Sequence, residues 1–301
     1  MSKKILLPVG LVVLVLAIVG FLTGPIGIGF LESFGMPLLM DEPLIEKPHI
    51  ELAASHIVGP ITNTILASWL TMIVLVLIFF LGTRRAKLVP GRFQALMETI
   101  VETLLTFVES VIGKGKARMV FPLVATIFLF VAFNAWLGLL PIYGTIGLKG
   151  EGNGLESHLL RNPNTDVNLP LAIAIIAFFS IEMWGVRSIG LGKYVGQFVN
   201  LKAVVRSPLI GAIQLFVGGL EILSHFIRLI SFTFRLFGNM TAGEILLLVI
   251  TFLASFAVPV VFYGLELLVG FVQALIFAGL TLVFTTIAVT PHEEEAHGGG
   301  H

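Results

Sequence analysis

Residues 221–244 read EILSHFIRLISFTFRLFGNMTAGE, a sequence that mixes charged and apolar side chains within one stretch. It holds two arginines, one histidine and two glutamates in a run that is otherwise apolar enough to lie in lipid. A charged side chain near the centre of a bilayer costs about 2.5 to 3.5 kcal/mol on insertion scales, so such residues usually face protein or a water-filled path. The stretch therefore predicts a membrane helix with a functional polar face.

Most polar residues of this stretch share one face of a helix. They follow one another at spacings of four, three, seven and four residues, which keeps them on a narrow stripe. The stripe consists of Glu221, His225, Arg228, Arg235 and Asn239. Glu244 follows Arg235 by nine residues and so points to the opposite side. We therefore expect a polar stripe towards the start of the helix and a lone carboxylate on its other face.

The composition indicates an integral membrane protein. The 301 residues are 56% hydrophobic and 12% charged, and the mean hydropathy is +1.01, far from the values of soluble domains. Eighteen basic and eighteen acidic residues cancel, so no net charge points to nucleic acid as a partner. The chain has no cysteine, which excludes disulfides, thiol catalysis and thiolate metal sites.

The sequence predicts an all-α membrane protein with about six membrane helices. Apolar runs of spanning length occupy residues 5–22, 65–82, 120–140 and 169–185, and two longer runs occupy 208–256 and 259–290. Each long run exceeds the roughly 20 residues that cross a bilayer upright, so we expect both helices to be strongly tilted, partly flat or broken. The first run can also be a signal peptide, but no small-x-small cleavage site follows it, which favours a helix.

Loops and a surface helix are expected between the spans. Residues 92–113 carry apolar side chains at helical spacing and glutamates elsewhere, which predicts an amphipathic helix along the membrane surface. Residues 23–62 are acidic with scattered prolines and glycines, and residues 142–167 are rich in glycine and asparagine. Both segments are therefore expected to be aqueous loops.

Basic residues predict the orientation of the chain. Lys3, Lys4 and the clusters within 84–92, 114–118 and 187–206 fall on one side of a six-pass chain, and the acidic loop falls on the other. By the positive-inside rule, both termini are expected in the cytoplasm.

The chain is expected to have two parts. Residues 1–54 would form an N-terminal membrane helix and a non-cytoplasmic loop, and residues 55–301 a membrane domain with a helix hairpin over 208–290 and a short cytoplasmic tail. The tail, 291–301, contains histidines and acids that can chelate a metal, but a mobile tail without a metal is the simpler interpretation.

The two long helices are expected to form an antiparallel hairpin that turns near residues 255–259. Residues at equal depth then have numbers with a constant sum, which sets Gln273 level with Arg235 and Glu266 level with Glu244. Glu266 and Gln273 are seven residues apart and share one face of their helix. The hairpin thus predicts an acidic pair towards the non-cytoplasmic side, a central arginine and a polar stripe descending to the cytoplasm.

Structural explanations remain open for several of these residues. Glu221 can simply pair with Arg228, and His225 can be a hydrogen bonder between helices. Asn134, Gln214 and Glu182 are more simply packing or interfacial residues than members of a path. Two carboxylates at one depth repel, so Glu244 and Glu266 suit a proton relay better than a structural role.

Arg235 is the residue hardest to explain by structure alone. A guanidinium does not deprotonate in proteins, and no acidic residue lies within a helical turn of it. Its counter-charge is therefore expected to come from another chain.

Residues 235–244, RLFGNMTAGE, closely resemble the signature of subunit a of the F-type ATP synthase, the membrane stator that faces a rotating ring of c subunits. Further matches lie at residues 89–94 (VPGRFQ), 134–141, 166–168 (DVN) and 273–277 (QALIF), and at Glu221. The resemblance covers about residues 55–290. It implies a non-catalytic, ion-conducting subunit of the bacterial cell membrane without a cofactor. It also implies that c-ring subunits, peripheral-stalk b subunits and lipid are the partners.

The resemblance also implies roles for single residues. Arg235 resembles the essential arginine that interacts with the c-ring carboxylates, and Asn239, Glu244 and Gln273 match polar positions along the nearby ion path. Glu221 matches the acidic position of the cytoplasmic exit. Glu266 stands where some members have histidine, and Gly243 stands where some have a bulkier polar residue. Together with His225 and Arg228 on the stripe, these residues suggest two offset half-channels that Arg235 separates.

Two other functions are less consistent with the sequence. A secondary transporter could use Arg235 to bind an anionic substrate, but transporters usually show internal repeats, and none is evident. An intramembrane hydrolase would need a catalytic motif such as His-Glu-x-x-His, which the sequence lacks. Whether the coupling ion is H⁺ or Na⁺ does not follow from this sequence, because the selecting carboxylate belongs to the partner.

Overall fold

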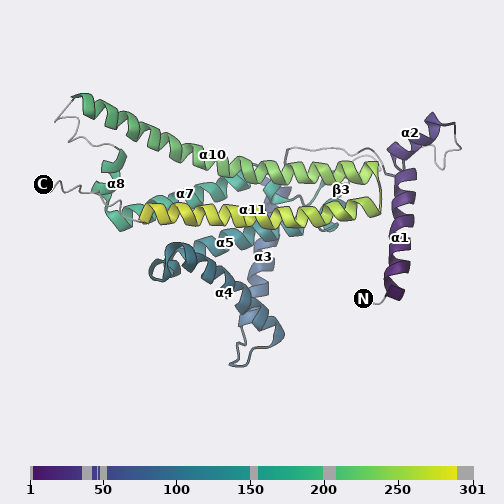
Figure 1. The fold of residues 1–301 in the computed structure, drawn as a ribbon, viewed down its shortest axis with the longest axis horizontal. Helices are drawn as coiled ribbons and strands as arrows, with labels where there is room; N and C mark the ends of the chain where they lie inside the picture. The colour runs from purple at the N-terminus through teal and green to yellow at the C-terminus, as the bar shows by residue number, and fades with distance from the viewer. Residues whose placement is uncertain are drawn as a thin grey trace. The chain divides into compact units, whose positions relative to one another are not determined.

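The structure is a computed structural model that describes residues 3–35, 43–45, 47, 53–149, 155–198 and 208–289 (Figure 1). Several residues used in the sequence interpretation lie outside this described part. They are Asp41, Glu42, Glu46 and Glu51 of the first loop, Lys202 and Arg206 of a basic cluster, the side chain of Gln214, and the tail 291–301.

The described part of the chain is almost entirely helical, as predicted. The main helices are α1 (Lys3–Leu22), α2 (Pro25–Ser33), α3 (Asn63–Thr83), α4 (Arg92–Ile112), α5 (Lys114–Gly138), α7 (Asn168–Ile189), α10 (Pro208–Leu253) and α11 (Ala257–Val289). Five of these helices are long and apolar enough to cross a membrane, or six if the bent pair of α1 and α2 counts as one span. The prediction of an all-α membrane protein with about six spans is confirmed.

Shorter elements lie between the spans. The helices α6 (Ile142–Thr145) and α8 (Leu191–Phe198) and the 3-10 turn η1 (Pro163–Thr165) are brief. Strands β1 (His56–Val58) and β2 (Ile61–Thr62) pair antiparallel, as do β3 (Gly147–Lys149) and β4 (Leu155–His158). The sequence predicts aqueous loops in both places but not these hairpins, because strands of two to four residues are too short to show alternation.

Two helix boundaries test the sequence predictions closely. The amphipathic helix expected over 92–113 is α4, and its apolar side buries Met97, Leu104 and Val108. The third span was predicted to begin at residue 120, but α5 begins at Lys114. This boundary was wrong because lysine and arginine are good helix formers, so the basic cluster continues the helix beyond its apolar part.

The long helices α10 and α11 form the predicted hairpin with a turn at residues 254–256 (Figure 1). A helix that continued past this point would need a backbone N–H at Pro259, which proline lacks. In α11 the same proline falls in the first turn, where a missing N–H costs little. Both helices are continuous, with 46 residues in α10 and 33 in α11, so neither is broken.

The chain divides into two compact units. Unit 1 comprises Met1–Trp69, Asn134–Asp166 and Phe237–Gln273, and unit 2 comprises Leu70–Phe133, Val167–Leu236 and Ala274–His301. The helix α10 therefore contributes its first part to unit 2 and its last part to unit 1, and α11 does the reverse.

In unit 1, the end of α5 packs closely on α11. A Cβ atom added to Gly270 would stand 2.7 Å from the Cβ of Ala135, so glycine is needed for this approach. The neighbouring Trp136 donates from Nε1 to the carbonyl of Leu267 at 3.1 Å. These contacts fix the part of α11 that carries Glu266 and Gln273.

In unit 2, aromatic and capping contacts hold α11. The Phe232 ring of α10 lies 5.1 Å from the ring of Phe277 and 5.8 Å from that of Phe284. At the end of α11, the carbonyl of Val289 accepts hydrogen bonds from Lys116 Nζ at 2.7 Å and from Ser188 Oγ at 3.0 Å. Such bonds satisfy a carbonyl that the helix itself leaves unpaired.

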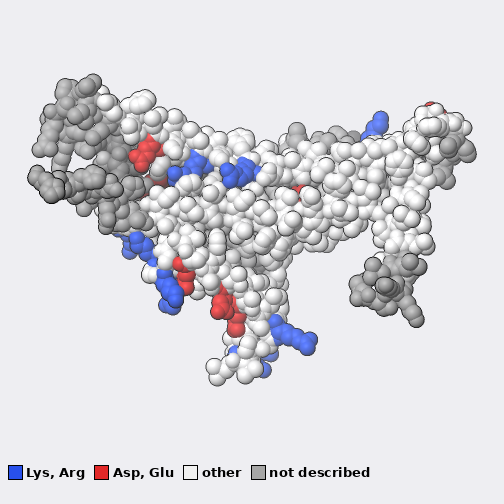
Figure 2. All heavy atoms as spheres, in the orientation of Figure 1, with Lys and Arg blue, Asp and Glu red and all other residues white. Residues whose placement is uncertain are grey.

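The surface matches a membrane environment. Many large apolar side chains of α1, α3, α7, α10 and α11 are exposed, which in a soluble monomer would be unusual for patches of this size. Figure 2 shows charged side chains of both signs gathered over α4, whereas the visible surface of α11 is almost uncharged.

Candidate functional site

In the part of the chain that the structure describes, candidate residues gather in a cluster of polar and charged side chains in each unit. The unit 1 cluster consists of Arg161, Asn239, Glu244, Glu266 and Gln273. The unit 2 cluster consists of Glu182, Tyr194, Glu221, His225 and Arg228. Eight residues are candidates for ion conduction from the sequence. Seven of them fall in one of these clusters, and the eighth, Arg235, does not.

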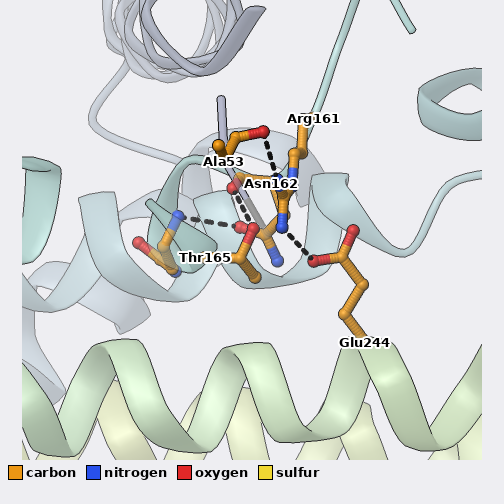
Figure 3. A network of polar contacts seen from close by, with 6 residues as sticks. Ala53, Arg161, Asn162, Thr165 and Glu244 are labelled. Carbon is orange, nitrogen blue, oxygen red and sulfur yellow. Dashed lines mark hydrogen bonds and ion pairs between the residues drawn. The ribbon is translucent and has the colours of Figure 1, made fainter. Parts of the chain in front are cut away.

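Glu244 of α10 pairs with an arginine from a loop (Figure 3). Arg161, which lies between β4 and η1, places Nη2 3.4 Å from Glu244 Oε2 and donates from Nη1 to the carbonyl of Ala53 at 3.0 Å. The arginine side chain is only 9% exposed, whereas that of Glu244 is 34% exposed. Glu244 is therefore a partly accessible carboxylate beside a buried, permanent positive charge.

The loop that carries Arg161 is held by local hydrogen bonds (Figure 3). Asn162 Oδ1 accepts from the backbone N–H of Asn164 at 3.0 Å, and the Asn162 carbonyl accepts from Thr165 Oγ1 at 2.8 Å. Asp166 Oδ2 then accepts from Thr64 Oγ1 of α3 at 2.7 Å. Part of the motif at 166–168 therefore anchors the loop to a membrane helix.

Glu266 is buried on α11 against the backbone of α10. Its side chain is 7% exposed, and a Cβ atom added to Gly243 would stand 2.1 Å from Glu266 Oε1. Only glycine leaves room for the carboxylate in this position. Glu266 thus lies beside the residue that precedes Glu244, and among the described residues no cation lies within ion-pair distance of it.

Asn239 and Gln273 join α10 to α11 in unit 1. Asn239 Nδ2 donates to Gln273 Oε1 at 2.8 Å. Gln273 is 2% exposed, and its Nε2 has no hydrogen-bond partner within the described part of the chain. A buried donor without a partner costs about 1–3 kcal/mol, so this amide is suited to a water or to a group from another chain.

The unit 2 cluster surrounds a pocket of about 240 Å³. Glu221, His225 and Arg228 all line it, so three members of the predicted stripe do share one face of α10. The other polar lining residues are Tyr194 and Ser224, and the remaining wall is apolar and comes mainly from α7 and α11. The pocket is thus a polar hollow between helices that are mainly apolar.

Arg228 is held by an aromatic ring rather than by an acid of its own helix. Its guanidinium carbon lies 3.6 Å from the centre of the Phe284 ring, a distance typical of a cation–π contact. Among the ion pairs of the described residues, none joins Arg228 to Glu221. The structural explanation of Glu221 as the partner of Arg228 therefore has no support in this geometry.

Glu182, for which the sequence favours a packing or interfacial role, makes contacts between helices. Its Oε1 lies 2.7 Å from His225 Nδ1, and its Oε2 accepts from the Tyr194 hydroxyl. An acidic residue inside an apolar span was itself the signal of a special role. Its partners were invisible because they lie 43 and 12 residues away.

Arg235 lies on α10 in unit 2 and belongs to neither cluster. It is exposed, and the adjacent Phe234 is also 59% exposed. Among the described residues, no carboxylate lies within ion-pair distance of Arg235. An exposed, permanently charged group on an apolar helix is open to a partner from outside the chain.

Comparisons with known proteins agree on one family. The family model described as ATP synthase A chain matches residues 65–286. The chain is 32% identical over 265 residues to ATP synthase subunit a of Gloeobacter violaceus, covering 87% of this chain and 99% of the relative. It is 35% identical over 234 residues to ATP synthase subunit a 2 of a Bradyrhizobium species, covering 77% and 92%. A Helicobacter pylori ATP synthase subunit a is 32% identical over 224 residues, covering 74% and 88%.

Proposed function

We propose, from the premise that this chain belongs to the ATP synthase A chain family, that it is the ion-conducting stator subunit of a rotary ATP synthase. The chain would carry no catalytic site of its own. It would pass protons to and from carboxylates on a ring of c subunits. The chain would hold its place in the bacterial membrane beside peripheral-stalk b subunits, with both termini in the cytoplasm.

Unit 1 would provide the inlet from the non-cytoplasmic side. Glu244 is partly accessible and Glu266 is buried close to the neighbouring Gly243. Protons would pass by these two carboxylates towards the Asn239–Gln273 pair. The buried Gln273 amide nitrogen, which has no partner within the described chain, supports this route because it can hold a water or a partner carboxylate.

Unit 2 would provide the outlet to the cytoplasm. Its pocket is lined by Glu221, His225 and Arg228, and the first two can accept protons. A proton released by a c-subunit carboxylate would enter this pocket and leave past Glu221. Neither route alone would cross the membrane, so net flow would require the ring to turn.

Arg235 would couple the flow to rotation. Its fixed charge would stabilise the ionised c-subunit carboxylate by Coulomb attraction in a medium of low dielectric constant. The same charge would oppose a proton that moves directly from one route to the other. The driving force is about 2.3 kcal/mol per elementary charge for each 100 mV of membrane potential. The observation that carries this proposal is an exposed arginine without an ion-pair partner in the described chain.

Substitution of Arg235 tests the proposal. We expect Arg235→Ala to abolish coupled ATP synthesis while the chain still assembles with the ring, because an exposed side chain contributes little to folding. The measurement is ATP synthesis in vesicles after an imposed proton gradient, with co-purification of the ring as the assembly control. Normal synthesis by the assembled variant would refute the proposed function.

A further inference from the structure

Unit 2 brings a carboxylate, an imidazole and a phenol together in one contact group, which we call the triad. Glu182 comes from α7, Tyr194 from α8 and His225 from α10. His225 Nδ1 lies 2.7 Å from Glu182 Oε1, and the Tyr194 hydroxyl donates to Glu182 Oε2. Both oxygens of the carboxylate are therefore engaged.

The triad borders the pocket of unit 2. His225 and Tyr194 line this pocket together with Glu221. The side chains of Glu182 and His225 are both half-buried. A group that exchanges protons must reach water, yet it must be enclosed enough to keep its geometry. The triad meets both requirements.

The hydrogen bonds of the triad fix which atom can exchange a proton. An ionised Glu182 can only accept, so Nδ1 of His225 carries the hydrogen of this bond, and a proton that the ring takes up is held at Nε2. Burial and the neighbouring Glu182 carboxylate raise the pKa of Tyr194, so its hydroxyl keeps its proton and remains a donor. A carboxylate held in this way fixes the tautomer of a histidine and stabilises its charged form.

We propose that His225 is the proton acceptor of the outlet path and that Glu182 and Tyr194 are the residues that position it. The neutral imidazole takes one proton at Nε2 from the pocket and becomes an imidazolium that Glu182 stabilises. It then loses the Nε2 proton to water beside Glu221, which restores the starting state. One proton enters and one leaves, and no other bond changes. This inference rests on the proposed function, because it assigns the carrier within the outlet.

The charged groups around the triad fit a short-lived imidazolium. From α10, Glu221 and Arg228 face the same pocket, whereas the α11 residues that line it, Phe284, Ile287 and Ala288, cannot titrate. Arg228 keeps its charge and repels a second cation, and Glu182 offsets that repulsion. A carrier must release its proton as readily as it takes it up. Neighbouring charges of opposite sign, here Arg228 and Glu182, favour such exchange.

A double-variant experiment tests whether Glu182 acts through His225. The intact complex is placed in vesicles, the catalytic sector is stripped, and passive proton flux is measured for Glu182→Gln, His225→Gln and the double variant. We expect each single change to lower the flux about tenfold, because His225→Gln removes the proton acceptor and Glu182→Gln removes the carboxylate that orients it. The double variant should be no slower than His225→Gln alone, because the two residues act as one unit. Normal flux in Glu182→Gln, or losses that multiply in the double variant, would overturn the inference.

A conservative pair of changes separates charge from packing. Glu182→Asp keeps the carboxylate, whereas Glu182→Gln keeps the size, so the inference predicts more flux with aspartate than with glutamine. A purely structural role predicts the reverse order. Glu102→Gln, an exposed change on α4, serves as the matched control and should leave the flux unchanged.

A further variant keeps the test decisive if the Glu182 variants fail to assemble. Tyr194→Phe retains the ring that packs on Gly185, where an added Cβ would stand 2.7 Å from Tyr194 Cε2, and removes only the hydroxyl. We expect normal assembly and a proton flux about threefold lower, the effect of one lost hydrogen bond. Unchanged flux would overturn the inference.

The outcomes for Arg235 and for the triad tell two failures apart. If Arg235→Ala abolishes ATP synthesis but the triad variants conduct normally, only this inference fails. If Arg235→Ala retains ATP synthesis, the proposed function fails.

Discussion

The two polar clusters differ in the partner that each gives to its carboxylate. In unit 1, Glu244 lies beside Arg161, whose guanidinium stays charged at every physiological pH. In unit 2, Glu182 lies beside His225, an imidazole whose ring nitrogens can each donate or accept a hydrogen bond. One carboxylate thus has a permanent counter-charge and the other has a titratable one.

This difference suggests a division of labour between the clusters. Arg161 gives Glu244 a fixed counter-charge that cannot itself exchange a proton. The partner of Glu182 is instead an imidazole, which can both donate and accept a hydrogen bond. Unit 1 offers few proton acceptors besides Glu244. In unit 2, Glu221 and His225 line one pocket, and Glu182 contacts His225.

The largest expected effect comes from removing the charge of Glu244. We expect Glu244→Gln to slow passive proton flux about a hundredfold, the lower end of the range for loss of a general acid or base. Glu221→Gln should lower the flux about tenfold or less, because the proposed outlet holds other acceptors. Flux measured in stripped vesicles, with Glu102→Gln as the control, checks the order. If neither Glu244→Gln nor Glu221→Gln changed the proton flux, the scheme of two separate proton paths would be contradicted.

A smaller effect is expected from the arginine that pairs with Glu244. Arg161→Gln removes the permanent charge and leaves the Ala53 carbonyl without its donor, which should cost about 1–3 kcal/mol of local stability. Proton flux should fall severalfold, and the complex should unfold at a lower temperature. Arg161→Lys keeps the charge but has no second nitrogen to reach both the Ala53 carbonyl and Glu244. Compared with Arg161→Gln, it should restore most of the proton flux but little of the lost stability. A variant as stable and as conductive as the wild type would refute a role for this pair.

The smallest effect is expected at Gly243. In Gly243→Ala the new methyl group would collide with the Glu266 carboxylate, but a flexible side chain can turn away. We therefore expect little change in stability and a proton flux a fewfold lower, because the displaced carboxylate leaves its place in the proposed inlet. Gly264→Ala, a change on α11 with no atom within 4 Å of the added Cβ, is the matched control. If both variants conduct normally, the position of Glu266 does not matter to the path.

Much of the fold could be predicted from the sequence, because apolar length and helical spacing act locally. The hairpin turn followed from the break in the two apolar runs before Pro259. The start of α5 was misjudged, since hydropathy marks the apolar part of a helix and not its charged first turns. The β-hairpins were missed because their strands have too few residues to show a pattern.

The polar clusters were predicted only in part. The stripe on α10 could be predicted because Glu221, His225 and Arg228 depend on one helix alone. Arg161 and Tyr194 were missed because each reaches its partner from a loop or a short helix, and nothing in their local sequence indicates the contact. Side chains that meet across elements require the folded chain.

The central claim is that each unit opens to one side of the membrane only. The chain has no cysteine, so Glu244→Cys in unit 1 and Ser224→Cys in unit 2 each create a single reactive thiol. Both variants are treated in oriented vesicles with a membrane-impermeant thiol reagent applied from either side. We expect the Glu244→Cys thiol to react only from the non-cytoplasmic side and the Ser224→Cys thiol only from the cytoplasmic side. Reaction of either thiol from both sides would indicate a continuous pore and would contradict the account.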